Sequence, residues 1–156
     1  MTMRIAFKQY VRQCGACSLC CKVMGVSDGD FQKPKDQWCQ YAKAGRGCAI
    51  YETRPSPCRS FQCLWLAGQF GGPEFRPDKI HGVVTRTSDG QNWVIHEDPG
   101  YAGVAREKLR SVIEAWLRHD ATHYVVVVCG TARTFLGQPA MFERLRRAGA
   151  AEVAGT

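Results

Sequence analysis

The sequence predicts an α+β fold in which a cysteine-rich, metal-nucleated loop module packs on a small antiparallel or mixed sheet with one main amphipathic helix. Residues 11–66 are rich in Cys, Gly and Pro and carry no sustained hydrophobic periodicity. Residues 78–148 instead alternate strand-like and helix-like apolar patterns. A chain of 156 residues is the size of one ordinary domain, so we expect both regions to form a single compact unit over residues 1–156.

The first element predicted in the second region is a β-hairpin. Residues 80–87 are rich in β-branched side chains, residues 92–97 alternate polar and apolar side chains, and the turn-forming segment 88–91 separates them. After a Pro-Gly break, apolar side chains recur at helical spacing, which predicts an amphipathic helix over residues 102–119.

Two further elements are predicted towards the end of the chain. Residues 124–129 read YVVVVC, which is typical of a buried strand. Phe142 and Leu145 are spaced to share one face of a short final helix. We expect the tail from Gly149 to be loose.

The net charge of +7 is concentrated in the cysteine-rich half. Residues 1–63 hold ten Lys or Arg against four Asp or Glu, whereas residues 64–156 hold eleven against ten. Metal-bound thiols are deprotonated, so eight cysteine thiolates with two divalent ions would leave four negative charges. The basic excess therefore favours charge balance at a metal site over a nucleic-acid interface.

The interpretation of the nine cysteines depends on the cellular compartment of the protein. Residues 1–10 show no secretory signal, and no apolar run approaches the roughly 20 residues that a membrane-spanning helix needs. Both features predict a cytoplasmic protein that makes no membrane contact. In a reducing cytosol, clustered cysteines bind metal or do redox chemistry more often than they form disulfides.

The first cysteine cluster reads C-x-x-C-x-x-C-C over residues 14–21. A C-x-x-C turn brings two sulfurs to about 2.3 Å from a shared ion. The adjacent Cys20 and Cys21 tend to point in different directions, so we predict that they serve two metal centres or two irons of one cluster. A redox dithiol at Cys14 and Cys17 is a weaker interpretation, because no clean strand precedes it.

A second set of four cysteines completes the ligand inventory. Four plus four thiolates match two all-cysteine tetrahedral zinc sites, and the same inventory also suits a cubane iron–sulfur cluster. Soft thiolate ligands select zinc, iron–sulfur or cuprous copper, and the sequence does not separate these. The predicted metal ligands are Cys14, Cys17, Cys20, Cys21, Cys39, Cys48, Cys58 and Cys63.

The strings CGACSLCC (14–21) and GCAIYETRPSPCRSFQC (47–63) resemble the bacterial CxxCxxCC cysteine-cluster proteins, also called YkgJ-type, which are described as a zinc- or iron-chelating domain. The resemblance covers residues 14–63 and continues weakly through Trp65 and residues 76–78. It implies metal chelation through the eight cysteines and names no reaction. A similar motif occurs in flagellin lysine methylases, but this chain is much shorter and has no convincing glycine-rich cofactor loop.

Side chains beside the cysteines have predicted supporting roles. Tyr51, Arg54 and Arg59 are candidates to donate hydrogen bonds to thiolate sulfurs and to lower the charge of the cluster. Trp38 and Trp65 lie close to cysteines in the sequence, and we expect them to shield the metal from water.

Outside the cluster, two features have simpler interpretations. Cys129 ends the Val-rich strand, so we expect a core residue and not a ninth ligand. His81 and His96 are expected to face each other across the predicted hairpin, near Glu97. A solvated sheet face is the simplest interpretation of that pair, and a second polar site is the alternative.

Three functions remain open from the sequence. The first is a metal-binding module without catalysis, whose role is structural zinc binding, metal storage or delivery, or the binding of a protein partner. The second is an enzyme or electron carrier that uses an iron–sulfur cluster in redox or protein-modification chemistry. The third is a zinc-stabilised nucleic-acid binder, which the thiolate charges disfavour. No spacing of residues identifies catalytic groups.

Overall fold

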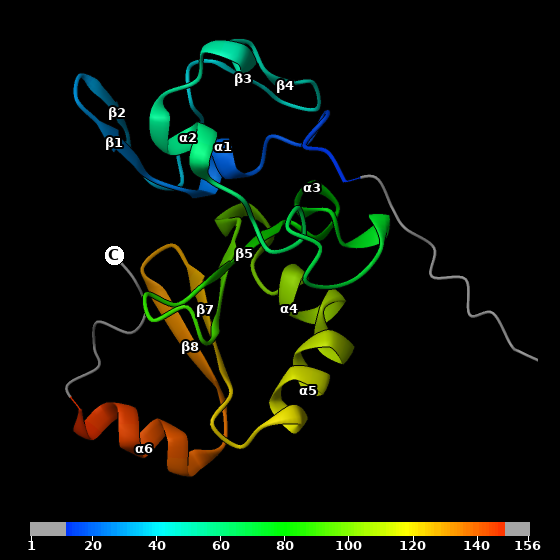
Figure 1. Cartoon of the computed structure of the whole chain (residues 1–156), viewed down its shortest axis with the longest axis vertical. Helices are drawn as coiled ribbons and strands as arrows, with labels where there is room; N and C mark the ends of the chain where they lie inside the picture. Colours follow the sequence, from blue (N-terminus) through cyan, green and yellow to red (C-terminus); the bar gives the residue numbers. More distant parts are fainter. Residues whose placement is uncertain (1–11, 149–156) are drawn as a thin grey trace, which may run out of the picture.

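The computed structural model describes residues 12–148, and these form two parts that are stacked in Figure 1. The cysteine-rich segment lies at the top of that view, and a four-stranded mixed sheet with helices on either side lies below it. The predicted α+β class is confirmed. Residue 11 of the predicted cysteine module and the predicted loose tail lie outside the described residues.

The main sheet contains the strands β5 (Gly82–Arg86), β6 (Trp93–Glu97), β7 (Tyr124–Cys129) and β8 (Ala132–Gly137), in that spatial order. β5 and β6 form the predicted antiparallel hairpin, with Val84 opposite Ile95. β6 and β7 run parallel, with Val94 opposite Val126, and β8 returns antiparallel to β7. The parallel pair requires a crossover, which the helical segment between these strands supplies.

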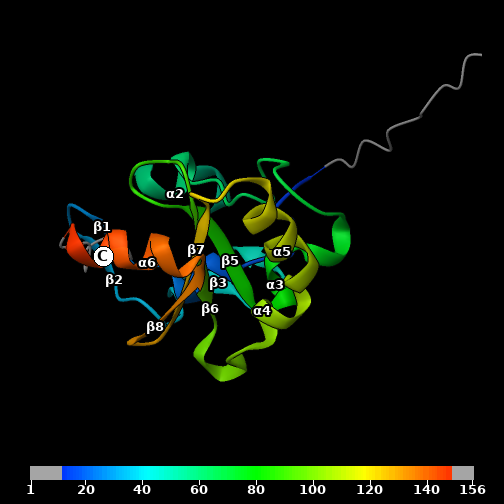
Figure 2. The same ribbon diagram turned by 90° about the horizontal axis from the view of Figure 1, so that it is seen from below.

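Each face of the sheet has its own hydrophobic core, and Figure 2 shows the sheet between two helical layers. On one face, Ile95 and Val127 pack with Ile113 of α5 (Arg110–His119), and the indoles of Trp93 and Trp116 stack with centroids 4.6 Å apart. The opposite face packs against α6 (Pro139–Arg147). Its core residues are Val94, Tyr124, Val126 and Val128, with Phe135, Met141 and Leu145 packed against them.

The predicted helix over residues 102–119 is divided into α4 (Val104–Lys108) and α5 by a one-residue break at Leu109. Leu109 is buried, and its backbone angles, φ −91° and ψ 5°, leave the helical region. The N-terminus of α4 is held from outside the helix, because the Glu97 carboxylate accepts the N–H groups of Gly103 and Arg106. The structure therefore has two short helices where the periodicity predicts one, and a tertiary contact holds the start of the first.

The cysteine-rich part consists of short elements joined by loops. β1 (Val26–Asp28) pairs with β2 (Phe31–Lys33), and β3 (Ala42–Lys43) pairs with β4 (Gly47–Cys48). The helical pieces of this part are α1 (Cys20–Val23), η1 (Tyr51–Thr53) and α2 (Ser56–Ser60). The connector to the sheet adds η2 (Pro73–Phe75) and α3 (Pro77–Ile80), and η3 (Pro99–Tyr101) follows β6.

The cysteine-rich part and the sheet share one hydrophobic core. Leu19, Val23 and Trp65 are buried in the same cluster as the sheet residues. The Leu64 N–H donates to the Val84 carbonyl at 2.8 Å, which ties the loop to the edge strand β5. An ion pair of 2.8 Å between Lys22 Nζ and Asp98 Oδ1 adds a second tie. Among residues 12–148, no helix is long and apolar enough to cross a membrane.

The buried Glu97 carboxylate gives a test of this arrangement. We expect Glu97→Ala to lower the free energy of unfolding by about 3 kcal/mol, because it leaves two partly buried backbone N–H groups without their acceptor and removes the partner of Arg106. Glu107→Ala is the matched control and should cost under about 1 kcal/mol, because its pair with Arg110 is exposed. Urea unfolding followed by circular dichroism measures both, and equal losses would contradict the prediction.

Candidate metal centre

The first cysteine string is held by a turn followed by a helix. The Cys17 N–H donates to the Cys14 carbonyl at 2.7 Å, with Gly15 in the turn at φ +50°, and α1 then starts at Cys20. Gly47 packs against this turn so closely that a Cβ there would lie 2.6 Å from the Gly15 carbonyl oxygen. Gly47 therefore allows the β3–β4 hairpin, which carries Cys48, to lie directly against the first C-x-x-C turn.

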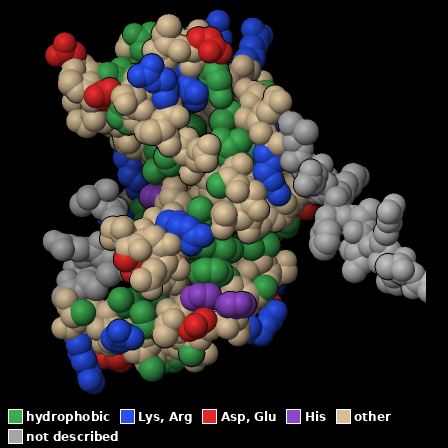
Figure 3. Space-filling view, viewed as in Figure 1, with side chains coloured by type: hydrophobic (Ala, Val, Ile, Leu, Met, Phe, Trp, Pro, Cys, Tyr) green, Lys and Arg blue, Asp and Glu red, His purple; other side chains and the backbone are tan. Residues whose placement is uncertain are grey.

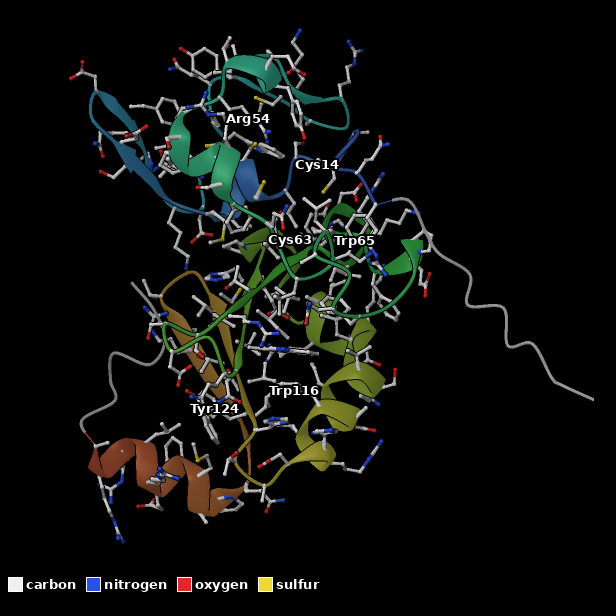
Figure 4. The ribbon with its side chains drawn as sticks, in the orientation of Figure 1. Cys14, Arg54, Cys63, Trp65, Trp116 and Tyr124 are labelled. Atoms are coloured by element: carbon white, nitrogen blue, oxygen red, sulfur yellow. The ribbon has the colours of Figure 1, made fainter. Side chains whose placement is uncertain are left out.

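The remaining cysteines are brought to the same region by other elements. The Cys39 N–H donates to the Cys21 carbonyl at 2.9 Å, which joins the two cysteine segments. Cys58 lies in α2, and the buried Cys63 follows it in the loop that leads to the sheet. Figure 4 shows Cys14 and Arg54 in the upper part, and Cys63 beside Trp65 at the junction with the sheet.

Two neighbouring cavities lie among these thiols. The larger, of about 160 Å³, is lined by seven of the predicted ligands: Cys14, Cys17, Cys20, Cys21, Cys39, Cys48 and Cys58. The smaller, of about 50 Å³, is lined by Cys63 together with Cys14, Cys17, Cys20 and Cys58. Each of the eight predicted ligands therefore borders at least one of the two cavities.

The electrostatics divide the thiols into two neighbourhoods. Burial raises the pKa of Cys58, and the charges of the Cys21, Cys39 and Cys48 thiols raise it further. Burial likewise raises the pKa of Cys63, where Cys14 is the thiol whose charge acts on it. One neighbourhood therefore surrounds Cys58, and the other joins Cys63 to the first C-x-x-C turn.

The adjacent Cys20 and Cys21 lie between the two neighbourhoods, and their pKa values are shifted in opposite directions. A hydrogen bond to Cys21, followed by burial and the charges of neighbouring thiols, raises the pKa of Cys20. The same hydrogen bond, helped by the charges of Lys33 and Arg54, lowers the pKa of Cys21 to about 7. Cys21 is therefore the member of the pair that ionises first.

Backbone N–H groups point at two of the sulfurs. The Leu66 N–H lies 3.4 Å from Cys63 Sγ, and the Leu19 N–H donates to the Cys17 sulfur. Burial still raises the pKa of Cys17 to about 11, with the charge of Asp78 adding to it. A bound divalent ion reverses this preference, because a coordinating thiol is deprotonated. The N–H groups would then stabilise the thiolates.

Within residues 12–148, no three His, Cys, Asp or Glu side chains are arranged so that they could hold one metal ion as they stand. The thiols surround shared cavities without converging on one point. Ligation of a shared ion would therefore require the cysteine side chains to turn towards one another.

The predicted supporting residues have different positions. Arg54 lines both cavities, its Nε donates to the Tyr51 carbonyl at 2.7 Å, and its guanidinium lies 3.7 Å from the centroid of the Tyr51 ring. Tyr51 lines the larger cavity although it is exposed. Arg59 is exposed on α2 and is among the lining residues of neither cavity.

The two tryptophans also differ. Trp65 is buried and lines the smaller cavity, where it can exclude water as expected. Trp38 is 47% exposed and lines neither cavity, with Lys22 Nζ 5.8 Å from its ring centroid. The expectation that Trp38 shields the site is wrong, because the loop turns this side chain outwards.

Sequence reasoning missed Lys33, which is buried at the wall of the larger cavity. Its ammonium donates to the carbonyls of Lys22 and Met24, and the charges of Cys21, Cys39 and Cys20 act on it. The basic excess of residues 1–63 was the only sequence signal, and it does not single out one lysine.

The chain was compared with known proteins in three ways. No family model, curated protein or solved structure matches it. The resemblance to the CxxCxxCC cysteine-cluster family stays a prediction that rests on the residues quoted for it.

The two histidines of the hairpin do not face each other. His96 lies opposite Val83, and its Nε2 is 3.0 Å from Thr85 Oγ1, whereas His81 ends α3 and stacks on Tyr101 with centroids 3.7 Å apart. A polar site formed by the pair is excluded by this register. Cys129 is half-buried at the end of β7 and borders neither thiol cavity.

The partly buried His96 predicts a specific dependence of stability on pH. Burial, followed by the charges of Lys35 and Arg133, lowers the pKa of His96 to about 4. The unfolded chain, with a His pKa near 6.5, binds more protons between these values, so stability falls as the pH falls through that window. Acidification from about pH 7 to pH 5 should therefore cost about 2 kcal/mol at this residue.

Urea unfolding of the wild-type protein and His96→Gln at both pH values checks this. The stability difference between the two proteins should move by about 2 kcal/mol in favour of the variant at pH 5. Other acid-sensitive groups cancel in this comparison. A difference that does not change with pH would contradict the assignment.

Proposed function

We propose that this chain is a metal-binding protein that holds two metal ions, each through four cysteine thiolates. The observation that carries the proposal is that the eight predicted ligands border two adjacent cavities. Four thiolates around one ion form the closed tetrahedral site typical of structural zinc. Such persistent thiolates need a reducing environment, so a cytoplasmic location is part of the proposal.

The neighbourhoods of the thiols suggest how the ligands divide. Cys58 is influenced by three thiols, which gives the set Cys21, Cys39, Cys48 and Cys58. The smaller cavity is lined by Cys58 and four other cysteines, and with Cys58 in the first set these four give the second set: Cys14, Cys17, Cys20 and Cys63. Successive residues of a helix point about 100° apart, so Cys20 and Cys21 can serve different ions.

The chemistry of a closed zinc site is structural. Four thiolates leave no position for water or substrate, so the ions would stabilise the loops and take no part in a reaction. Lys33 and Arg54 lie beside the thiols and would offset part of the negative charge of the site. Under this proposal the chain serves as a metal-stabilised module or a metal carrier, with a protein partner as a further expectation.

One observation favours a second candidate, an iron–sulfur protein in redox or protein-modification chemistry. Seven thiols border the larger cavity, and a cubane cluster needs only four of them.

Elemental analysis and absorption spectra of protein purified without air separate the two candidates. Two zinc ions per chain and no colour support the first, and a brown protein with iron supports the second. Protein with neither metal would refute both.

The divided ligand set predicts the metal content of single variants. Cys20→Ser and Cys21→Ser should each lose about one of the two ions, because each removes one of the four ligands of a different site. Cys129→Ser is the matched control and should keep both, because Cys129 borders neither cavity. Metal analysis after desalting measures all three. Full metal content in either of the first two variants would contradict the division.

Removal of the metal should loosen the cysteine-rich part first. Its strands are two or three residues long, so its folding energy must come largely from ligation. We expect chelator to speed amide exchange within residues 14–63 before it affects β6 and β7. Exchange that rises equally in both parts would show that ligation does not nucleate the module.

A further inference from the structure

A third cavity lies away from the thiols, between the β1–β2 hairpin and one end of the sheet. Its volume of about 550 Å³ is within the range of roughly 300–1,000 Å³ found for small-molecule sites. The hairpin supplies one wall, and His96, Val128 and Arg133 of the sheet supply the other. Figure 1 shows the hairpin above the ends of β7 and β8. Figure 3 shows basic and histidine side chains between the upper and lower parts of the molecule.

The Lys and Arg side chains that line this cavity make it positively charged. Lys33, Lys35 and Arg133 line it, and no Asp or Glu is among the described residues that do. Lys33 is occupied by backbone carbonyls, and Lys35 Nζ contacts the Gly130 carbonyl at 3.0 Å and Asp36 at 3.6 Å. Arg133 is exposed, and its guanidinium makes no hydrogen bond or ion pair with another side chain or with a backbone carbonyl of residues 12–148. The Arg133 guanidinium is therefore available to an anion at the mouth of the cavity.

His96 adds a polar group at the inner wall. Its Nε2 is taken by Thr85, whereas its buried Nδ1 has no hydrogen-bond partner among the described residues. A buried nitrogen without a partner costs stability. His96 pairs with Val128 across β6 and β7, and Val128 pairs with Arg133 across β7 and β8, so the side chains of His96 and Arg133 lie on the same face of the sheet.

Apolar side chains also line this cavity. Met24 and Val26 are half-buried, and Pro34 is exposed. A bare inorganic ion would leave these side chains facing water. An anion that carries an organic body would cover them and would gain free energy from the apolar surface removed from water.

We propose that this cavity binds a small organic anion. The anionic group, a phosphate or a carboxylate, contacts Arg133 and Lys35, and the organic body packs on Met24, Val26 and Pro34 beside His96. Arginine suits this role because its planar group can donate two parallel hydrogen bonds to either anion. The site does not require metal at the thiols, so it stands or falls independently of the proposed function.

Isothermal titration calorimetry on the purified full chain tests the proposal with four probes: phenyl phosphate, benzoate, inorganic phosphate and phenol. We expect phenyl phosphate or benzoate to bind at least about tenfold more tightly than either inorganic phosphate or phenol, since only they satisfy both walls. Arg133→Gln should weaken that binding about tenfold, and Lys35→Gln should weaken it as well.

Arg144→Gln is the matched control, because it removes the same charge from the exposed face of α6 and leaves the cavity intact. Its affinity for the probes should equal that of the wild-type protein. Equal weakening by Arg133→Gln and Arg144→Gln would show non-specific attraction to a basic surface and overturn the proposal. Absence of saturable binding at about 10 mM of either organic anion would overturn it too.

Discussion

Crowding of partly buried thiols around two small cavities is the constraint on which the rest of the structure depends. A buried thiol resists ionisation, and the pKa of Cys17 rises to about 11 for this reason. Crowded thiols add mutual repulsion once they ionise, as the neighbours of Cys58 do. The nearby cations Lys33 and Arg54 offset only part of that repulsion. Divalent ions bound as proposed would supply the remaining positive charge, and would draw together loops that have little apolar surface of their own.

The same constraint reaches the sheet through α1. This helix is four residues long, and it presents Cys20 and Cys21 to the larger cavity while Val23 is fully buried in the core shared with the sheet. Cys63 and Leu64 belong to the same core, and the Leu64 N–H donates the hydrogen bond to β5. Movement of the thiols is therefore opposed by packing on the sheet, which gives the loops a rigid base.

Local patterns explain which parts of the fold the sequence predicts. The β5–β6 hairpin and β7 carry continuous apolar or alternating patterns, so both are recognised. The edge strand β8 is half-exposed and the strands β1–β4 are very short, so neither has such a pattern. The contact of the Glu97 carboxylate with the N-terminus of α4 comes from a neighbouring strand, so the periodicity of residues 102–119 does not show it. For the candidate site, the cysteines are evident in the sequence, but their two neighbourhoods and the buried Lys33 arise from tertiary contacts.

Lys33 also connects the two proposed sites. Met24, Val26 and Lys33 line both the larger thiol cavity and the proposed anion cavity, so the two share a wall. An all-thiolate centre on one side and a bound anion on the other would repel each other through this wall, since the protein interior screens charge poorly. The Lys33 ammonium, held by the carbonyls of Lys22 and Met24, lies in that wall and attracts both. A buried lysine at this position would therefore reduce the repulsion between the two proposed sites, and this explains its position better than either site does alone.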